Sequence, residues 1–400
     1  TTKKFEVQDL LAHDSGLPED TLTSLIGDFG YDFNHAIYAL RFIKPVAPFR
    51  TKFAYQDIFP MLAGRIIERT SGKSFTDSLH QNLFDPLQMR HTYGDEEKVY
   101  QLNDIAQPFY QSGGKLYAYP INSLYSSKLR ASGNGSDSSG GIHSSAMDMA
   151  KWLSFNINNG VYNNTQLVSN KNMQIIHSPQ TLIKNSSANV NLNGEAEQAY
   201  GVGWFIDKKE YQPYTVLYHP GGGMGMHALM AYIPEEKVGI VILTNTWGNK
   251  VPEALYRRFF DLYFNKKPLK DWNHTFLQEK KRANIKNQLT TNPSICKPDG
   301  ASADLNKYIG SYNNPVYGDL QISKQGDHLI LPIGPIGVIW ELSYCKDNTL
   351  KAYWPNPYGM KFQMLTDGQN LVEFTAKSNR IVKMTIPFLN DDGSGSFIKK

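Results

Sequence analysis

The sequence predicts an α+β domain followed by a small all-β domain, and three observations support this prediction. Apolar residues recur at helical spacing over residues 54–70. The run ALMAYI-PEEK-VGIVILTN at 228–245 is typical of a β-hairpin, with PEEK as the turn. From about residue 303, short alternating runs follow one another at near-regular spacing with turn residues between them, which indicates a small barrel or sandwich.

Bulk properties restrict the classes of function. The chain has 400 residues, 40% of them apolar, and this length allows roughly two or three domains. Its net charge is +4 without a clustered basic run, which argues against nucleic-acid binding. No segment approaches 18 consecutive apolar residues, so we expect no membrane span, and TTKKFEVQDLL at the N-terminus lacks the architecture of a signal peptide.

The two cysteines, Cys296 and Cys345, exclude a disulfide framework and any CxxC metal site. One disulfide and two free thiols both remain open. We expect no cofactor, because the chain has no P-loop, no H-E-x-x-H, and no pair spacing among its ten histidines that suggests zinc.

Two predicted helices and the stretch between them make up the first part of the predicted first domain. Helix-like periodicity at 54–70 ends at Gly72, and a second helix is predicted at 144–157, capped by Ser144 or Ser145. Between them, residues 106–141 are rich in glycine, serine and tyrosine and form either a linker or a long ordered loop.

The rest of the chain divides at a polar stretch. Strands are predicted across 198–245 and a helix at 251–264. Residues 266–302 are rich in lysine, asparagine and proline, and we expect a polar linker there. The predicted domains are therefore residues 1–265 and 303–400.

The stretch HPGGGMGMHA at 219–228 satisfies the glycine fingerprint of dinucleotide-binding proteins. That fingerprint needs a strand before the glycines and a helix after them. Here the glycines lead into the strand-like ALMAYI, and LTNTW stands where an acidic ribose ligand is needed. We therefore reject nucleotide binding. Glycines between two strands allow close approach to the backbone, so a substrate site and a flexible hairpin tip both remain open.

Six short motifs, each weak alone, stand in the order typical of one family. They are LLAHDSGLP (10–18), FAYQDIFPMLAGRIIERTSGKSF (53–75), LFDPLQMRHT (83–92), GGIHSSAMDMAKWL (140–153), YGVGWF (200–205) and YHPGGGMGMHALMAYIPEEKVGIVILTN (218–245). Together they resemble the serine β-lactamase-like superfamily, which includes class C β-lactamases, low-molecular-mass penicillin-binding proteins and related esterases and peptidases. The resemblance implies an antiparallel sheet flanked by helices, and the last hundred residues resemble the lipocalin-like domain that follows it in some members.

The resemblance implies acyl transfer through a serine, activated by the lysine of a Ser-x-x-Lys motif. Tyr55 and Asp57 occupy the family's Tyr-x-Asn position, with Tyr55 as the proton relay. Asp57 departs from the pattern, because an ionised carboxylate cannot donate the hydrogen bond that an asparagine amide gives.

The resemblance places three further residues at the site. His219 begins a His-x-Gly variant of the family's Lys-Thr-Gly strand, and Gly221 closes it. The backbone N–H of Gly222 would point into the oxyanion hole. An imidazole with an ordinary pKa near 6.5 attracts a carboxylate less well than lysine does. His13 and Ser15 belong to a loop motif that is structural in the family.

The nucleophile motif is missing from its usual place, because LLAHDSGLP already begins at Leu10. Four pairs elsewhere fit Ser-x-x-Lys, and none opens an amphipathic helix: Ser112/Lys115, Ser294/Lys297, Ser343/Lys346 and Ser396/Lys399. Three explanations remain open. The sequence is a fragment of a longer enzyme, which we favour; it is a non-catalytic homologue; or another chain supplies the missing piece.

The expected function is therefore a serine hydrolase acting on peptide, ester or β-lactam bonds, with Ser-x-x-Lys outside this chain. The alternative is a non-catalytic homologue that binds a cell-wall peptide or a protein partner. The expected partner of the enzyme is a small-molecule substrate, and the oligomeric state stays open. The resemblance also implies export to the periplasm or cell exterior.

Overall fold

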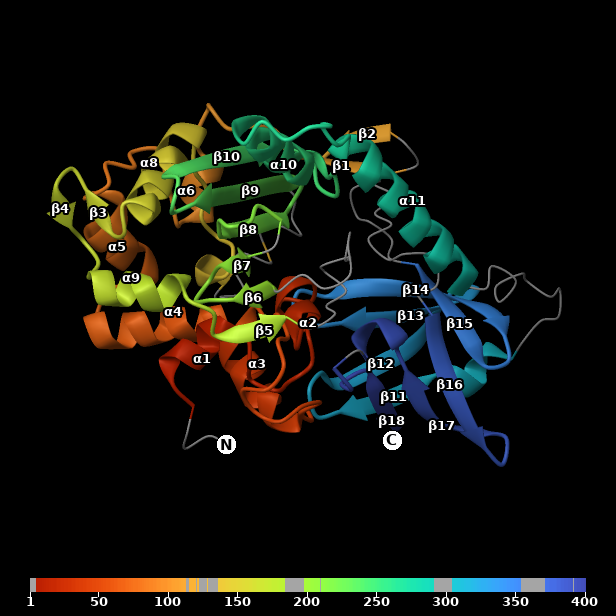
Figure 1. The fold of residues 1–400 in the computed structure, drawn as a ribbon. Coiled ribbons are helices and arrows are strands. Elements are labelled where there is room, and N and C mark those ends of the chain that lie inside the picture. The colour runs from red at the N-terminus through yellow and green to blue at the C-terminus, as the bar shows by residue number, and fades with distance from the viewer. Residues whose placement is uncertain are drawn as a thin grey trace. The chain divides into compact units, whose positions relative to one another are not determined.

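The computed structural model describes residues 5–112, 115–119, 121, 128, 136–183, 198–208, 210–290, 304–353, 371–390 and 392–400, with backbone only at 283–290. The chain divides into two compact units. The first comprises residues 1–16, 46–121 and 136–277, and the second residues 17–45, 122–135 and 278–400. Each unit is described below by itself (Figure 1).

The first unit is built on a six-stranded antiparallel sheet (green in Figure 1). Its strand order is β10 (Val238–Thr244), β9 (Met226–Ile233), β8 (Val216–Gly223), β7 (Phe205–Asp207), β6 (Gln198–Tyr200) and β5 (Thr181–Ile183). The predicted hairpin at 228–245 is confirmed as β9 and β10, which pair in antiparallel register around residues 234–237.

Helices cover both faces of this sheet. Helix α8 (Ala146–Ile157) packs on β9 and β10, where Leu153 joins a cluster with Trp204 and Leu217. Helix α10 (Val251–Tyr263) buries Tyr256 and Phe260 in the other cluster. The predicted α+β class, an antiparallel sheet flanked by helices, is therefore confirmed.

Local chemistry explains where the predicted helices begin and end. The Ser145 hydroxyl accepts a hydrogen bond from the Asp148 N–H, which caps α8 as expected. Helix α4 (Ile58–Ser71) ends at Gly72, whose φ of 70° suits glycine at a helix C-terminus. The predicted helix at 251–264 is confirmed as α10.

Smaller elements complete the first unit. They are α1 (Val7–Ala12), α5 (Phe75–Leu79), η3 (His80–Phe84), α6 (Glu96–Tyr100), β1 (Phe109–Ser112), β2 (Lys115–Ala118), η4 (Ser136–Ser138), β3 (Val161–Tyr162), β4 (Thr165–Gln166) and α9 (Asn170–His177). Helix α11 (Trp272–Thr290) lies within the segment predicted as a polar linker and crosses from the first unit into the second.

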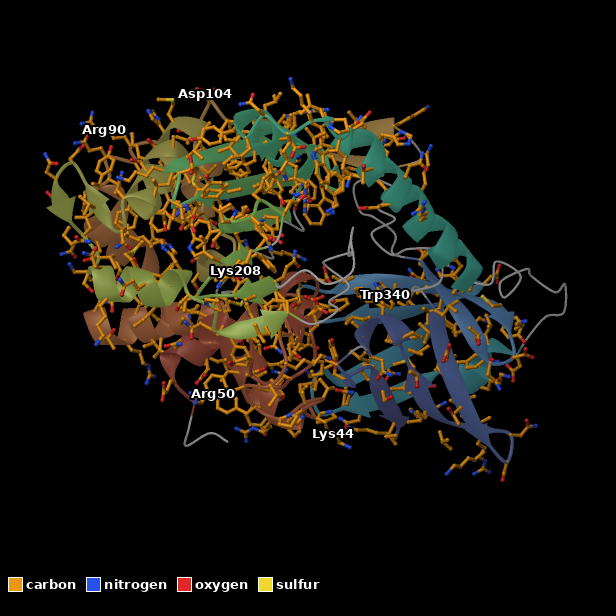
Figure 2. The ribbon with its side chains drawn as sticks, viewed as in Figure 1. Lys44, Arg50, Arg90, Asp104, Lys208 and Trp340 are labelled. Atoms are coloured by element: carbon orange, nitrogen blue, oxygen red, sulfur yellow. The ribbon has the colours of Figure 1, made fainter. Side chains whose placement is uncertain are left out.

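The second unit contains a closed barrel of eight antiparallel strands (blue in Figure 1), which confirms the predicted small all-β domain. In chain order they are β11 (Gly310–Asn314), β12 (Gly318–Gln325), β13 (His328–Ile333), β14 (Val338–Lys346), β15 (Thr349–Tyr353), β16 (Leu371–Lys377), β17 (Arg380–Thr385) and β18 (Ser396–Lys399). A barrel of eight strands is just wide enough for side chains to fill it. Buried apolar residues such as Leu331, Trp340 and Leu342 alternate along its strands, and Figure 2 labels Trp340 among them. A likeness to lipocalins stays a prediction.

The barrel also receives a segment from far upstream in the sequence. Residues 17–45, with α2 (Thr23–Gly27), α3 (Phe33–Ala39) and η2 (Leu40–Phe42), belong to the second unit. The Tyr31 hydroxyl donates to the Tyr317 carbonyl at 2.6 Å, and the Phe29 ring meets Trp340 edge-on at 6.1 Å. From sequence, this segment was predicted to lie in the first domain, residues 1–265.

None of the helices in the described ranges has the length and apolar character that crossing a membrane requires.

Candidate functional site

Tyr55 lies in the short segment that leads into α4, and hydrogen bonds with His13 and Ser15 hold this segment in place. The Ala54 N–H donates to the His13 carbonyl at 2.8 Å, and the Gln56 N–H donates to His13 Nδ1 at 3.3 Å. The Ser15 hydroxyl donates to Gln56 Oε1 at 2.8 Å. His13 and Ser15 thus brace the Tyr55 segment, in line with the structural part that the resemblance implies for them.

His13 is a neutral hydrogen-bond acceptor in this arrangement. Burial, with a smaller contribution from the charge of His219, lowers the pKa of His13 to about 3. A protonated ring could not accept the Gln56 N–H at Nδ1. The ring lies 4.2 Å from that of Tyr55, so His13 supports the predicted tyrosine directly.

The predicted site residues from distant parts of the chain meet here. The ring centroids of Tyr55 and His219 are 6.1 Å apart, and both side chains are half-buried. Asp57 is the N-cap residue of α4 and is close enough for its charge to raise the pKa of Tyr200, after burial and Tyr55. The fold thus brings Tyr55, Asp57 and His219 to the same region, and their catalytic roles stay predictions.

His219 makes two hydrogen bonds through its ring. Nδ1 lies 2.6 Å from the Pro220 carbonyl oxygen, and Nε2 lies 3.0 Å from the Tyr200 hydroxyl. Burial lowers the pKa of His219, while the Pro220 carbonyl opposes that shift. Tyr200, to which the sequence analysis gave no role, thus belongs to the site. Its motif YGVGWF was the only signal that could have found it.

The glycines after His219 lie at the end of β8. Met224 and Gly225 have φ values of 46° and 81°, as a two-residue hairpin loop of the primed type requires, so β9 follows directly. The strand–glycine–strand context used to reject nucleotide binding is confirmed.

Strand pairing determines the direction of the Gly222 N–H. A two-residue loop is closed by a hydrogen-bonded pair, here Gly223 with Met226, and bonded and non-bonded pairs then alternate along the ladder. Gly222 and Pro220 fall at non-bonded positions, which suits a proline because it has no N–H to donate. The Gly222 N–H therefore points away from β9, on the side where the pairing of β7 with β8 ends at Tyr218.

Trp247 explains why position 222 needs glycine. A Cβ atom at Gly222 would lie 2.0 Å from Trp247 Cζ3, whereas a Cβ at Gly221 would meet no atom within 4 Å. The Trp247 N–H donates to the Phe109 carbonyl at 3.0 Å, which fixes the indole-bearing loop. Trp247 is thus a neighbour of the site that the sequence analysis missed.

The Ser-x-x-Lys pairs of the sequence lie in the wrong structures for a nucleophile motif. Ser396/Lys399 lies on β18, where residues three apart point to opposite faces, and Ser343/Lys346 lies on β14 across a β-bulge between Tyr344 and Lys346. Ser112 ends β1 and Lys115 begins β2, and Ser294/Lys297 falls outside the described residues. Within the part of the chain that the structure describes, none of these serines opens a helix.

Among the described residues, no group of three or more histidine, cysteine, aspartate or glutamate side chains is placed to hold a metal ion.

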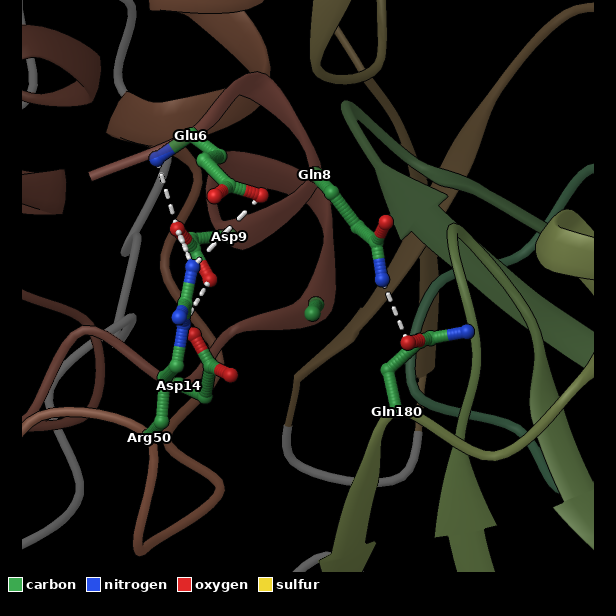
Figure 3. A pocket seen from close by; sticks show the side chains of 7 residues that line it. Glu6, Gln8, Asp9, Asp14, Arg50 and Gln180 are labelled. Atoms are coloured by element: carbon green, nitrogen blue, oxygen red, sulfur yellow. Dashed lines mark hydrogen bonds and ion pairs between the residues drawn. The ribbon is translucent and has the colours of Figure 1, made fainter. Parts of the chain in front are cut away.

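A polar pocket lies beside the turn that carries His13 (Figure 3). Arg50 forms a two-point ion pair with Asp9, with N–O distances of 2.7 and 2.9 Å, and Glu6 lies 3.7 Å from the same guanidinium. Asp14 is 5% exposed, and its Oδ1 has no hydrogen-bond partner. Burial, followed by the charge of Asp9, raises the pKa of Asp14 to about 6.

Two family models match parts of the chain. The family model described as Beta-lactamase matches residues 1–262, and a second model, described as a domain of unknown function (DUF3471), matches residues 297–395. The structure of the octameric penicillin-binding protein homologue from Pyrococcus abyssi aligns with 98% of this chain and 77% of its own, at 21% identity and a TM-score of 0.51. That likeness concerns the fold.

Two curated relatives are about a quarter identical to the chain over the aligned stretches. An unguisins hydrolase, ungD′, from Aspergillus campestris is 24% identical over 336 residues, which are 80% of this chain and 59% of the relative. The N-acetylmuramyl-L-alanine amidase of Bacillus subtilis is 26% identical over 257 residues, 60% of this chain and 56% of the relative. The chain thus spans less than two thirds of the length of these relatives.

Proposed function

This chain belongs to the beta-lactamase family, and from that premise we propose that it is the larger part of a serine hydrolase that acts through an acyl-enzyme on peptide, ester or β-lactam bonds. One observation carries the proposal. The ring centroids of Tyr55 and His219 lie 6.1 Å apart, and His219 is close in sequence to Gly222, whose N–H points away from β9. The names of the relatives, a hydrolase and an amidase, support the same reaction class.

The nucleophile in this proposal is the serine of a Ser-x-x-Lys motif outside the given sequence. Two observations support this placement. The chain spans only 56–59% of the two relatives described above. In addition, the Ser-x-x-Lys pairs within the described residues lie on or between strands, so none resembles a serine activated at the start of a helix.

The reaction then follows from ordinary acyl-transfer chemistry. The serine hydroxyl attacks the substrate carbonyl carbon, and its proton passes to the base and, through the Tyr55 hydroxyl, to the leaving group. The carbonyl oxygen becomes an oxyanion and accepts a hydrogen bond from the Gly222 N–H. Breaking the bond to the leaving group gives the acyl-enzyme, which water hydrolyses to regenerate the serine.

The residues at the site favour substrates that carry no carboxylate beside the reacting bond. Where the family pattern places a lysine ammonium, this chain has the His219 imidazole, whose pKa burial lowers. Asp57 adds a carboxylate where the pattern has asparagine, and like charges repel. Neutral esters and amides therefore fit better than acids such as β-lactams.

The test is covalent labelling and turnover in the longest form that the gene encodes. We expect a fluorophosphonate probe to label one serine and p-nitrophenyl acetate to be hydrolysed. Tyr55→Phe should lower kcat by about 100-fold, since a positioned proton relay contributes roughly 10²–10⁴. Tyr214→Phe is the matched control, because Tyr214 is also half-buried against the same apolar cluster. Equal activity of Tyr55→Phe and the control would remove Tyr55 from the mechanism.

A second candidate is a non-catalytic homologue that binds a cell-wall peptide or a protein partner. Asp57 favours it, since this carboxylate cannot donate a hydrogen bond to a substrate carbonyl. Saturable binding of a muramyl peptide by the longest form, with neither probe labelling nor turnover, would favour this candidate over the hydrolase.

We also propose that the protein is exported. Cys345 is disulfide-bonded, and such bonds persist mainly in oxidising compartments. Protein that is purified without a reductant and then unfolded should react with maleimide only after reduction. Labelling of Cys345 without a reductant would contradict the proposal.

A further inference from the structure

The hydrogen bonds of His219 define which ring nitrogen carries its proton. The Pro220 carbonyl oxygen, 2.6 Å from Nδ1, can only accept, so Nδ1 must carry a hydrogen. In the neutral ring, Nε2 is then a bare acceptor, and the Tyr200 hydroxyl 3.0 Å away donates to it. Both nitrogens of His219 are thus occupied without any substrate.

Tyr200 is a rigid donor in this pair. The residue is 1% exposed, and its ring packs against those of Phe53 at 5.1 Å, Phe205 at 4.8 Å and His13 at 5.0 Å. Burial raises the pKa of Tyr200 well above its ordinary value, with smaller contributions from Tyr55 and Asp57. The hydroxyl therefore keeps its proton at every physiological pH.

The contact between Tyr200 and His219 depends on the length of the strand between them. Tyr200 ends β6 and His219 lies on β8, with the three-residue strand β7 between these two in the sheet. The pairing of β7 with β8 ends at Phe205 and Tyr218, one residue before His219. The His219 ring can thus turn past the end of β7, with its centroid 5.3 Å from that of Phe205, and reach Tyr200.

The titratable groups near His219 come from three elements, whereas the flanking strands β7 and β9 place Phe205 and Met230 beside it. The titratable groups are His13 from the end of α1, Tyr55 and Asp57 from the start of α4, and Tyr200 from β6. His13 is neutral, with a pKa of about 3, and both tyrosines are uncharged at neutral pH. A hydrogen bond donated to Nε2 stabilises the neutral imidazole and burial acts in the same direction, while the Pro220 carbonyl and the negative charge of Asp57 act against them.

We propose that Tyr200 is a positioning residue that holds the His219 imidazole neutral, in its Nδ1–H form and in one orientation, and thereby makes the site select acyl substrates without a carboxylate. This inference rests on the proposed function for its substrate class, whereas the positioning itself does not. His219 is then no general base, because its single lone pair is committed to Tyr200. The neutral imidazole instead stands where the family pattern has a charged lysine ammonium.

The direct test is a histidine titration by ¹⁵N nuclear magnetic resonance in the chain as it stands. Wild-type His219 should show a protonated Nδ1 and a bare Nε2. Tyr200→Phe removes only the hydroxyl and should raise the proton affinity of His219 by roughly two- to tenfold, the worth of one lost hydrogen bond.

Tyr232→Phe is the matched control for this titration. Tyr232 is also fully buried, and its hydroxyl lies 2.8 Å from Nε2 of another histidine, His177. It should change the titration of His177 and leave that of His219 in place. A wild-type His219 protonated at Nε2, or an unchanged His219 titration in Tyr200→Phe, would overturn the proposal.

The substrate-class arm compares two aryl esters, p-nitrophenyl acetate and mono-p-nitrophenyl succinate, with the longest form of the protein at pH 5.5. In Tyr200→Phe the ratio of kcat/KM for the succinate ester to that for the acetate ester should rise several-fold, and in Tyr232→Phe it should stay constant. An unchanged ratio in Tyr200→Phe would overturn the selection of uncharged substrates. If the wild type hydrolyses neither ester, the proposed function fails, and the titration still decides the role of Tyr200.

Discussion

Replacing Gly222 with alanine should destabilise the strand end that carries the proposed oxyanion N–H. The new methyl group would lie 2.0 and 2.6 Å from two indole carbons of Trp247, where carbon atoms normally stay about 3.5 Å apart. Either the half-exposed indole moves outward by roughly 1.5 Å or β8 shifts. Overpacking of this kind costs about 1–3 kcal/mol, so the thermal midpoint should fall by roughly 2–12 °C.

The assay is thermal unfolding followed by near-ultraviolet circular dichroism, with Gly221→Ala as control. A methyl group at Gly221 meets no atom within 4 Å and should change the midpoint by less than about 2 °C. In a Trp247→Ala background, Gly222→Ala should lose most of its effect, because the clashing ring is gone. An equal loss in both backgrounds would refute the clash as the cause.

Three further predictions concern single side chains. Asp14→Asn should raise the free energy of unfolding at pH 7.5 by up to about 3 kcal/mol, and screening by solvent in the pocket lowers this figure. The native Asp14 carboxyl keeps its proton up to pH about 6, while the unfolded one releases it near pH 4. Wild-type stability should therefore fall as pH rises from 4 to 6, and a urea-unfolding series in which Asp14→Asn follows the same pH profile would contradict this. Arg50→Met should destabilise the protein, because it leaves the buried Asp9 carboxylate without its cation, and Arg50→Met with Asp9→Leu should recover most of the loss in the same assay. Trp247→Ala should leave the proton affinity of His219 unchanged in the ¹⁵N titration; a shift would show that Tyr200 is not the residue in control.

Elements with strong local patterns were predictable from sequence. The hairpin of β9 and β10 follows from two β-rich runs around a PEEK turn, and α4, α8 and α10 follow from apolar spacing and caps. The regular β-runs of the last hundred residues likewise indicated the barrel. In each case the determinants lie within about ten residues of one another in sequence.

Contacts between distant residues were not predictable from local patterns. The packing of residues 17–45 in the barrel unit depends on pairs such as Tyr31 with Tyr317. The short helices α2 and α3 carry no periodic apolar pattern that would indicate what they pack against. The pairing of Asp9 with Arg50 likewise depends on a turn that brings α1 against the loop before α4.

The candidate site was predictable only where a family motif marks it. Tyr55, Asp57 and His219 were identified by motif, and the fold places them together. Tyr200 and Trp247 were missed because their contacts with the site are not local in sequence. Tyr200 reaches His219 only because β7 is short. Trp247 lies against β8 only because Gly222 has no side chain.

We propose that these residues complete an acyl-transfer site around a serine outside the given sequence. Intact-protein and peptide mass spectrometry of the longest encoded form, after reaction with a fluorophosphonate, tests it most directly. We expect one adduct per chain, on the serine of a Ser-x-x-Lys motif outside residues 1–400, and no adduct after that serine is replaced by alanine. No adduct, or an adduct on a serine within residues 1–400, would contradict it.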